Sequence, residues 1–255
     1  MKMEWNEIAL GMAKEVERQV MPLFGTAKAG QKVGMNVSGD VTKFVDKVAE
    51  DIVLGYLSPL NINIVSEEVG NIDRGSEYTA IIDPIDGSYN FAAGIPISAF
   101  SFAVFKNKKP VYAMIYEFAT KSVYEGIPGE GAYMNSNPIH VRKPVRGKEA
   151  LSFYTRGRGY GIIRRVKRVR VLGAVAVELT YLAKGALDGV LDIRNYVRPT
   201  DIAAGVIIAR EAGAIVTDEN GEELRLDFDA AEKTNIIAVN DRYLLDLILE
   251  ELGKK

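Results

Sequence analysis

The segment from Ile81 to Asp86 constrains this chain more than any other part of its sequence. It completes a short apolar run, Tyr78 to Asp83, whose isoleucines predict a buried strand. Asp83 ends that run, the next residue is a proline that forces a turn, and Asp86 follows the turn. We therefore expect the two carboxylates to face one point at the end of a buried strand.

Gly87 and Ser88 follow these acids and could open a helix, whose free N–H groups and positive dipole end suit an anion such as phosphate. The alternative is structural, because an isolated Asp-Pro or Asp-Gly pair is usually only a turn or a helix cap. A calcium loop of the EF-hand type fits poorly, since Ile85 and Gly87 occupy positions where that loop needs oxygen-bearing side chains. We favour a metal site with an anion site beside it.

Two further acids lie at the starts or ends of predicted elements. Glu67 follows the predicted strand Asn61 to Ser66, and parallel neighbouring strands bring their carboxyl ends to one edge of a sheet. Asp201 lies in the first turn of a predicted helix from Thr200 to Glu211. Taken alone, Glu67 is typical of a solvated surface and Asp201 of a partner for the helix dipole.

The order of these motifs resembles that of the inositol monophosphatase and fructose-1,6-bisphosphatase family. Ser-Glu-Glu, Asp-Pro-Ile-Asp-Gly-Ser and Asp-Ile-Ala-Ala-Gly follow one another, and the Gly39 to Thr42 segment with Asp46 and the Glu211 to Ala214 segment also match in order. The resemblance covers nearly the whole chain. It implies an α/β fold, a layered α/β/α/β/α sandwich of the sugar-phosphatase type.

The resemblance also implies a site for two or three Mg²⁺ ions, for which Mn²⁺ could substitute. Its metal ligands would be Glu67, Asp83, the backbone carbonyl of Ile85, Asp86 and Asp201, with Asp83 bridging two ions. Hard oxygen ligands suit Mg²⁺, and two cations could activate a water and stabilise the leaving oxygen of a phosphate monoester. The resemblance also implies that Ser88 and either Asp46 or Asp40 lie near the attacking water, and that Thr42 belongs to the same catalytic group.

Two residues depart from the family pattern. Ser88 stands where many relatives carry threonine, but it keeps the hydroxyl. Thr200 stands where inositol phosphatases commonly have tryptophan, which weakens an assignment to inositol phosphates alone.

A basic segment points to a second phosphate on the substrate. Seven arginines and lysines lie between Arg156 and Arg170, and a distal phosphate would need such donors. Our leading candidates are Arg170 and Arg198; family positions that approach the substrate are Gly87, Ser88, Gly173, Val175 and Arg194. The expected activity is a fructose-1,6-bisphosphate 1-phosphatase that also hydrolyses inositol 1-phosphate. The alternatives are an inositol monophosphatase proper, a 3′-phosphoadenosine phosphatase, and a regulatory protein that binds a phosphorylated ligand without turnover.

Composition excludes several other kinds of site. The chain has no cysteine and a single histidine, His140, so disulfides, thiolate sites and His-rich zinc sites are excluded. A net charge of −2 gives no support to a nucleic-acid or membrane partner, and the short Arg-Gly-Arg-Gly-Tyr-Gly motif is frequent by chance. Without a long apolar run we expect a cytoplasmic location. A homodimer is expected only by analogy with the family.

The pattern of elements divides the chain into two halves. Residues 1–145 are expected to form an α+β half with most metal ligands, and residues 146–255 an α/β half that completes the site. The Gly25 to Gly39 segment has no periodicity and predicts a mobile loop that responds to metal binding. A helix is expected from a cap at Asn240 through Leu252.

Overall fold

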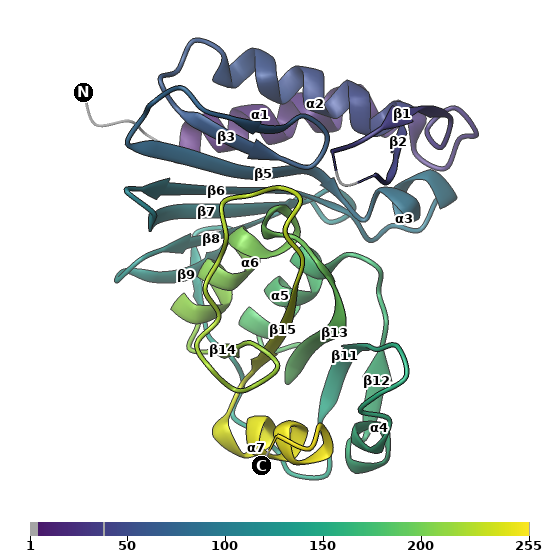
Figure 1. Cartoon of the computed structure of the whole chain (residues 1–255), viewed down its shortest axis with the longest axis vertical. Helices are drawn as coiled ribbons and strands as arrows, with labels where there is room; N and C mark the ends of the chain where they lie inside the picture. The colour runs from purple at the N-terminus through teal and green to yellow at the C-terminus, as the bar shows by residue number, and fades with distance from the viewer. Residues whose placement is uncertain (1–4, 38, 255) are drawn as a thin grey trace.

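The computed structural model describes residues 5–37 and 39–254, and its helices and sheets form five layers (Figure 1). One pair of helices covers the first sheet, a second pair lies between the two sheets, and further helices cover the second sheet. The helices are α1 (Trp5–Val20), η1 (Met21–Leu23), α2 (Phe44–Leu57), α3 (Ser88–Ala93), α4 (Gly161–Arg165), α5 (Val175–Ala183), α6 (Pro199–Glu211) and α7 (Arg242–Glu251). The expected layered α/β/α/β/α architecture is confirmed. Among the described residues, no helix combines the length and apolar character needed to span a bilayer.

The first sheet has eight strands in the order β10-β9-β8-β7-β6-β5-β3-β4. Its strands are β3 (Asn63–Ser66), β4 (Gly70–Ile72), β5 (Tyr78–Asp86), β6 (Ala99–Lys106), β7 (Lys109–Glu117), β8 (Ser122–Ile127), β9 (Gly131–Met134) and β10 (Asn137–Ile139). β3 and β5 run parallel, with Ser66 opposite Ile82, so Glu67 and Asp83 follow at the same edge. Strands β5 to β10 form an antiparallel meander.

The prediction that the strand ends at Asp83 is wrong. β5 continues to Asp86, and its register with β6 shifts between these two acids. Pro84 lies within the shift; proline has no N–H for the ladder, but it tolerates an extended backbone at such an irregularity. The irregularity lets both acids stay on one strand.

The second sheet has five strands in the order β12-β11-β13-β15-β14. Its strands are β11 (Ala150–Tyr154), β12 (Arg168–Arg170), β13 (Gly189–Val197), β14 (Ile215–Thr217) and β15 (Thr234–Val239). β11 pairs in parallel with β12 and β13, and β15 pairs antiparallel with β13 and β14. After β15, the side chain of Asp241 caps α7 by accepting from Leu244 N at 3.0 Å, so the expected cap at Asn240 is one residue too early.

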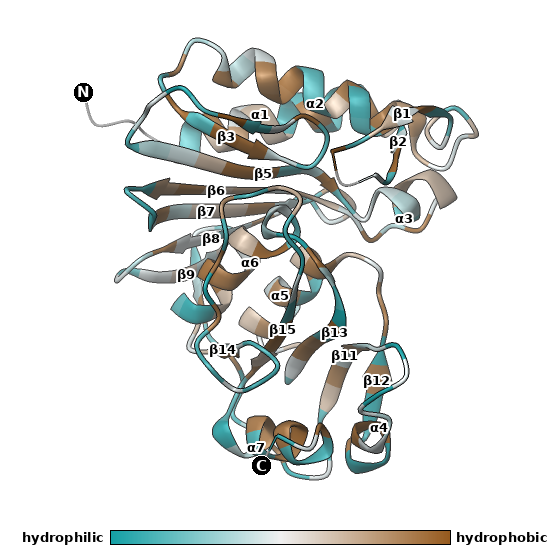
Figure 2. Ribbon diagram, viewed as in Figure 1, coloured by the Kyte–Doolittle hydropathy of each residue, from teal (hydrophilic) through white to brown (hydrophobic). Residues whose placement is uncertain are grey.

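Alternate residues of β5 serve different cores, as a period of two requires. Ile82 packs in the cluster under α1 and α2, whereas Ile81 packs with residues of α5 and α6. Figure 2 shows hydrophobic residues along the central strands of the first sheet, between these helix layers. The Ile81 cluster includes residues on both sides of position 145, so the core runs without a break across the expected boundary between halves.

The Gly25 to Gly39 segment contains more structure than its sequence predicts. Within it β1 (Lys32–Met35) pairs antiparallel with β2 (Val41–Lys43), and the residue at 38 lies outside the described part. Short hairpin strands carry too few residues to produce a clear periodic pattern. That the Gly25 to Gly39 segment responds to metal binding stays a prediction.

Gly205 allows α6 to approach α5 closely, and this contact yields a prediction about stability. A Cβ at Gly205 would lie 2.5 Å from Leu179 Cδ1, so Gly205→Ala should destabilise the fold by about 1–3 kcal/mol through overpacking. The matched control is Gly55→Ala on the exposed face of α2, where a Cβ meets nothing within 4 Å. That variant should gain roughly 0.5–1 kcal/mol of stability from helix propensity. Chemical denaturation of both variants tests this, and equal effects would contradict the close packing.

Candidate active site

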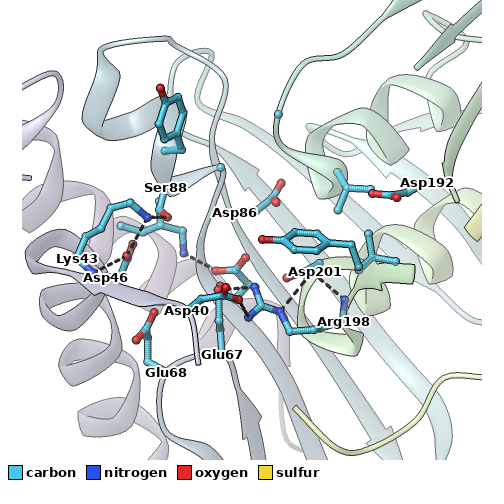
Figure 3. Close-up of a pocket in the computed structure, with 18 of the residues that line it drawn as sticks. Asp40, Lys43, Asp46, Glu67, Glu68, Asp86, Ser88, Asp192, Arg198 and Asp201 are labelled. Atoms are coloured by element: carbon cyan, nitrogen blue, oxygen red, sulfur yellow. Dashed lines mark hydrogen bonds and ion pairs between the residues drawn. The ribbon is translucent and has the colours of Figure 1, made fainter. Parts of the chain in front are cut away.

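A cavity of about 370 Å³ opens where the ends of β3, β5 and β13 meet the first turns of α5 and α6 (Figure 3). All the residues expected to bind metal line it: Glu67, Asp83, Ile85, Asp86 and Asp201. Glu67 directly follows β3, three of the others belong to β5, and Asp201 lies in the first turn of α6. The two halves of the chain therefore contribute to one site.

Three of these acids lie close enough to share a cation. Carboxylate oxygens of Glu67, Asp83 and Asp201 lie within 4.8 Å of one another. Asp83 Oδ1 accepts from the N–H of Ile85 at 2.9 Å, which fixes the orientation of its carboxylate. Converging carboxylate oxygens are the donor set that hard divalent cations prefer, so these residues fit such an ion.

Burial makes the charged forms of these acids costly. Burial together with repulsion from the nearby Asp201 raises the pKa of Glu67 to about 8, although the charge of Arg198 opposes the rise. Burial also raises the pKa values of Asp83 and Asp86 well above their usual range, with repulsion from neighbouring acids adding to the effect. A cation would remove most of this penalty, because it supplies the missing opposite charge.

Arg198 already supplies part of that charge. Its Nη2 lies 2.5 Å from Glu67 Oε1 and its Nη1 lies 3.3 Å from Asp40 Oδ2, while its side chain is only 8% exposed. The carboxylate of Asp201 accepts from Arg198 N at 2.8 Å and so caps α6. The guanidinium of Arg198 therefore pairs with acids of the site. The geometry gives no support to its expected role at a distal phosphate.

Asp86 lies against the first turn of α5. Its Oδ2 accepts from Ala176 N at 3.0 Å and from Val177 N at 3.4 Å, two of the N–H groups that a helix start leaves free. The next residue, Gly87, has φ 79°, and a Cβ there would lie 2.8 Å from the carbonyl oxygen of Ile97. Only glycine combines this positive φ with so close an approach to the Ile97 carbonyl.

Ser88 and Asp46 meet on the other side of the cavity, with a lysine between them that the sequence analysis missed. Lys43 Nζ donates to Ser88 Oγ at 2.9 Å and lies 3.6 Å from Asp46 Oδ2 (Figure 3). Burial raises the pKa of Asp46, and the Lys43 charge opposes that rise. Asp40 also lines the cavity, whereas Thr42 does not; its hydroxyl donates to Glu68 instead.

Another part of the cavity wall carries three of the residues expected to contact substrate. Gly173, Val175 and Arg194 line it together with Tyr154 and Tyr196. Arg194 lies 4.5 Å from the ring centroid of Tyr154 and 4.9 Å from that of Tyr196, close enough for cation–π attraction. Asp192 fixes this guanidinium through an ion pair of 2.5 Å.

Arg170 is not brought to this cavity. Its side chain is exposed on β12, at the edge of the second sheet, and its Nη1 donates to the carbonyl of Val169. The structure thus gives no support to its expected contact with substrate, because charge density along a sequence does not show which way an edge strand faces. Asp192 was missed as well, because it lies inside β13 and so gives no strand-end signal of the kind that revealed Asp83. A single lysine such as Lys43 gives no comparable signal.

Comparison with known proteins agrees with this geometry. The model of the inositol monophosphatase family matches residues 1–255. A fructose-1,6-bisphosphatase/inositol-1-monophosphatase of Thermococcus kodakarensis is 65% identical over 252 residues, which cover 99% of this chain and 98% of that protein.

Two solved structures match closely. One is described as an inositol monophosphatase–fructose 1,6-bisphosphatase, with a TM-score of 0.95, 49% identity, and coverage of 98% of this chain and 100% of the other. The second is a hypothetical protein from Pyrococcus horikoshii with similarities to inositol-1 monophosphatase, with a TM-score of 0.92, 53% identity and 97% coverage of both chains.

The acid cluster predicts how stability depends on pH. Glu67 has an ordinary pKa of 4.5 and a folded value of about 8, so between these values the folded protein holds more protons than the unfolded chain. Without divalent cations, the melting temperature should therefore fall as pH rises from about 4.5 to about 8. Asp83→Asn should weaken this dependence by removing one repelling charge. Scanning calorimetry in chelator tests it, and a melting temperature that rises throughout this range would contradict the electrostatic account.

Proposed function

This chain belongs to the inositol monophosphatase family, and from that membership we propose that it hydrolyses phosphate monoesters of sugars or polyols with Mg²⁺. The observation that carries the proposal is the convergence of Glu67, Asp83 and Asp201 oxygens in a cavity that also holds Ser88. The names of the relatives support fructose 1,6-bisphosphate, cleaved at its 1-phosphate, and inositol 1-phosphate as substrates.

Mg²⁺ would be held by Glu67, Asp83, Asp201, Asp86 and the Ile85 carbonyl, as two or three ions for which Mn²⁺ could substitute. When bound, the ions would lower the pKa of a water and stabilise charge on the leaving oxygen. Side chains of the protein itself would position the water and the substrate.

Ser88 and Asp46 would orient the water. Because the Ser88 hydroxyl accepts from Lys43, its proton is free to point to the Asp46 carboxylate, and that carboxylate can take up a proton. Asp40, held by Arg198, is the alternative acid for this role, but of the two only Asp46 forms a hydrogen bond with Ser88.

The cations gathered around Tyr196, a residue of the cavity wall, support a bisphosphate substrate. Three cations surround the Tyr196 ring: Arg194 at 4.9 Å, Arg156 at 5.3 Å and Lys233 at 5.3 Å from its centroid. Within residues 5–37 and 39–254, Arg156 and Lys233 form no ion pair, so their charges are free to hold a distal phosphate. We assign the second phosphate to this group in place of Arg170 and Arg198.

The homodimer and the cytoplasmic location stay predictions from the sequence. A binding protein without turnover is the competing class, because a fold alone does not establish chemistry. Release of inorganic phosphate from fructose 1,6-bisphosphate, measured with and without Mg²⁺, separates an enzyme from such a protein. Phosphate release that depends on Mg²⁺ supports the proposal, and its absence on every sugar and polyol phosphate refutes it.

Asp83→Asn should abolish this turnover and leave the fold intact. The substitution removes the charge of the central ligand while hardly changing its shape, so the loss should persist at saturating Mg²⁺. The matched control is Asp51→Asn on the exposed face of α2, which should keep wild-type rates. Phosphate-release kinetics and circular dichroism on both variants provide the measurement. Wild-type activity of Asp83→Asn would refute the assignment of this ligand.

The double variant Arg156→Ala/Lys233→Ala should lose activity selectively. A charge-assisted hydrogen bond contributes about 1.5–3 kcal/mol, so kcat/KM for fructose 1,6-bisphosphate should fall roughly tenfold to hundredfold relative to that for inositol 1-phosphate. Arg170→Ala, on the exposed edge strand, is the control and should change both substrates little. If Arg170→Ala gave the selective loss and the double variant did not, the second phosphate would lie at β12 instead.

A further inference from the structure

Glu178, in the first turn of α5, is a fully buried carboxylate to which the mechanism above gives no role. Three donors converge on its Oε1: Ser152 Oγ at 2.7 Å, Tyr154 Oη at 2.8 Å and Leu172 N at 2.7 Å. Its side chain is 0% exposed, and its Oε2 has no hydrogen-bond partner among the described residues. One oxygen atom therefore collects three hydrogen bonds from two separate segments of the chain.

Two of these donors belong to the wall of the cavity or adjoin it. The Tyr154 hydroxyl, besides donating to Glu178, accepts from Gly173 N at 2.6 Å, and both Tyr154 and Gly173 line the cavity. From the other side, Asn90 Nδ2 donates to the carbonyl of Leu172 at 2.7 Å. The turn at Leu172 and Gly173 is thus fixed by hydrogen bonds from α5, β11 and α3.

The same contacts fix the ring on which Arg194 lies. The Tyr154 hydroxyl is held between Glu178 and Gly173, and the guanidinium of Arg194 lies 4.5 Å from the ring centroid. A change in the ring's position would move the face against which this cation rests. Glu178 therefore acts on the cavity at two places, the Leu172–Gly173 turn and the Tyr154 ring.

Stability alone gives no reason for an acid at this position. Burial raises the pKa of Glu178 to about 7, which reflects the cost of a charge in the core. Well-packed apolar side chains often replace buried charges without loss of stability when the partners are replaced too. What an apolar residue cannot provide is one acceptor that holds three donors in a fixed arrangement.

We propose that Glu178 is a positioning residue that sets substrate affinity by fixing the Tyr154 ring and the Leu172–Gly173 turn. It does not contact the substrate; it holds the wall against which the hydroxyl face of a sugar or polyol phosphate rests. This inference depends on the proposed function, because it concerns the same cavity.

Tyr154→Phe and Ser152→Ala form a matched pair of tests. Each removes one hydroxyl that donates to Glu178 Oε1, but only Tyr154 belongs to the cavity wall. We expect Tyr154→Phe to raise KM for inositol 1-phosphate about tenfold while kcat changes less than about threefold. Ser152→Ala should lower the melting temperature and change KM less than about twofold. Equal KM values in the two variants would overturn the proposal.

Glu178→Gln and Glu178→Leu test whether the hydrogen-bond acceptor at position 178 matters, or only the volume of its side chain. The glutamine carbonyl oxygen can accept all three donors, so this conservative variant should restore KM to within about threefold of wild type. The leucine variant leaves the donors unpaired and should raise KM at least about tenfold wherever circular dichroism shows it folded. If the leucine variant does not fold, the glutamine and Tyr154→Phe variants decide the matter.

The outcomes distinguish this inference from the function on which it rests. Wild-type protein that releases no phosphate from any substrate would refute the proposed function and this inference with it. An active wild type whose Tyr154→Phe variant keeps wild-type KM, or whose Glu178→Gln variant is as impaired as a folded leucine variant, would refute this inference alone.

Discussion

The site depends on acids of like charge that are held together away from water. Glu67, Asp83 and Asp201 bring oxygens within 4.8 Å of one another, and burial raises the pKa values of all three. Such a cluster destabilises the folded state unless a positively charged group lies beside it. Arg198 supplies one positive charge and holds two of these acids, so a divalent cation would have to compete with this arginine or work beside it.

The layered fold is what makes this cluster possible. The parallel pair β3 and β5 brings two acids to one edge of the first sheet, and α5 and α6 lie between the sheets with their first turns at that edge. Asp86 then accepts from α5 and Asp201 caps α6. Two acids 134 positions apart, Glu67 and Asp201, meet because both sheets pack against the same two helices. Glu178, on the same helix, fixes the turn at Leu172 and Gly173 in the cavity wall.

The sequence predicts the acids of this site better than it predicts the residues that would contact the rest of the substrate. Asp83 is recognisable because a buried strand leads into it, whereas Asp201 could be assigned only from the family resemblance. Arg170 and Arg198 could not be placed from charge alone, because one faces solvent at a sheet edge and the other is buried among acids. The cations around Tyr196 come from three separate segments, so no local pattern joins them.

The most direct test of this account is a calorimetric titration of the protein with Mg²⁺ in buffers of different ionisation enthalpy. Because the folded acids hold protons that a bound cation would displace, binding near pH 7 should release protons, and the affinity should weaken as pH falls. The observed heat should therefore depend on the buffer. Binding whose heat is the same in every buffer, or no Mg²⁺ binding at all, would contradict the claim that these buried acids form a cation site.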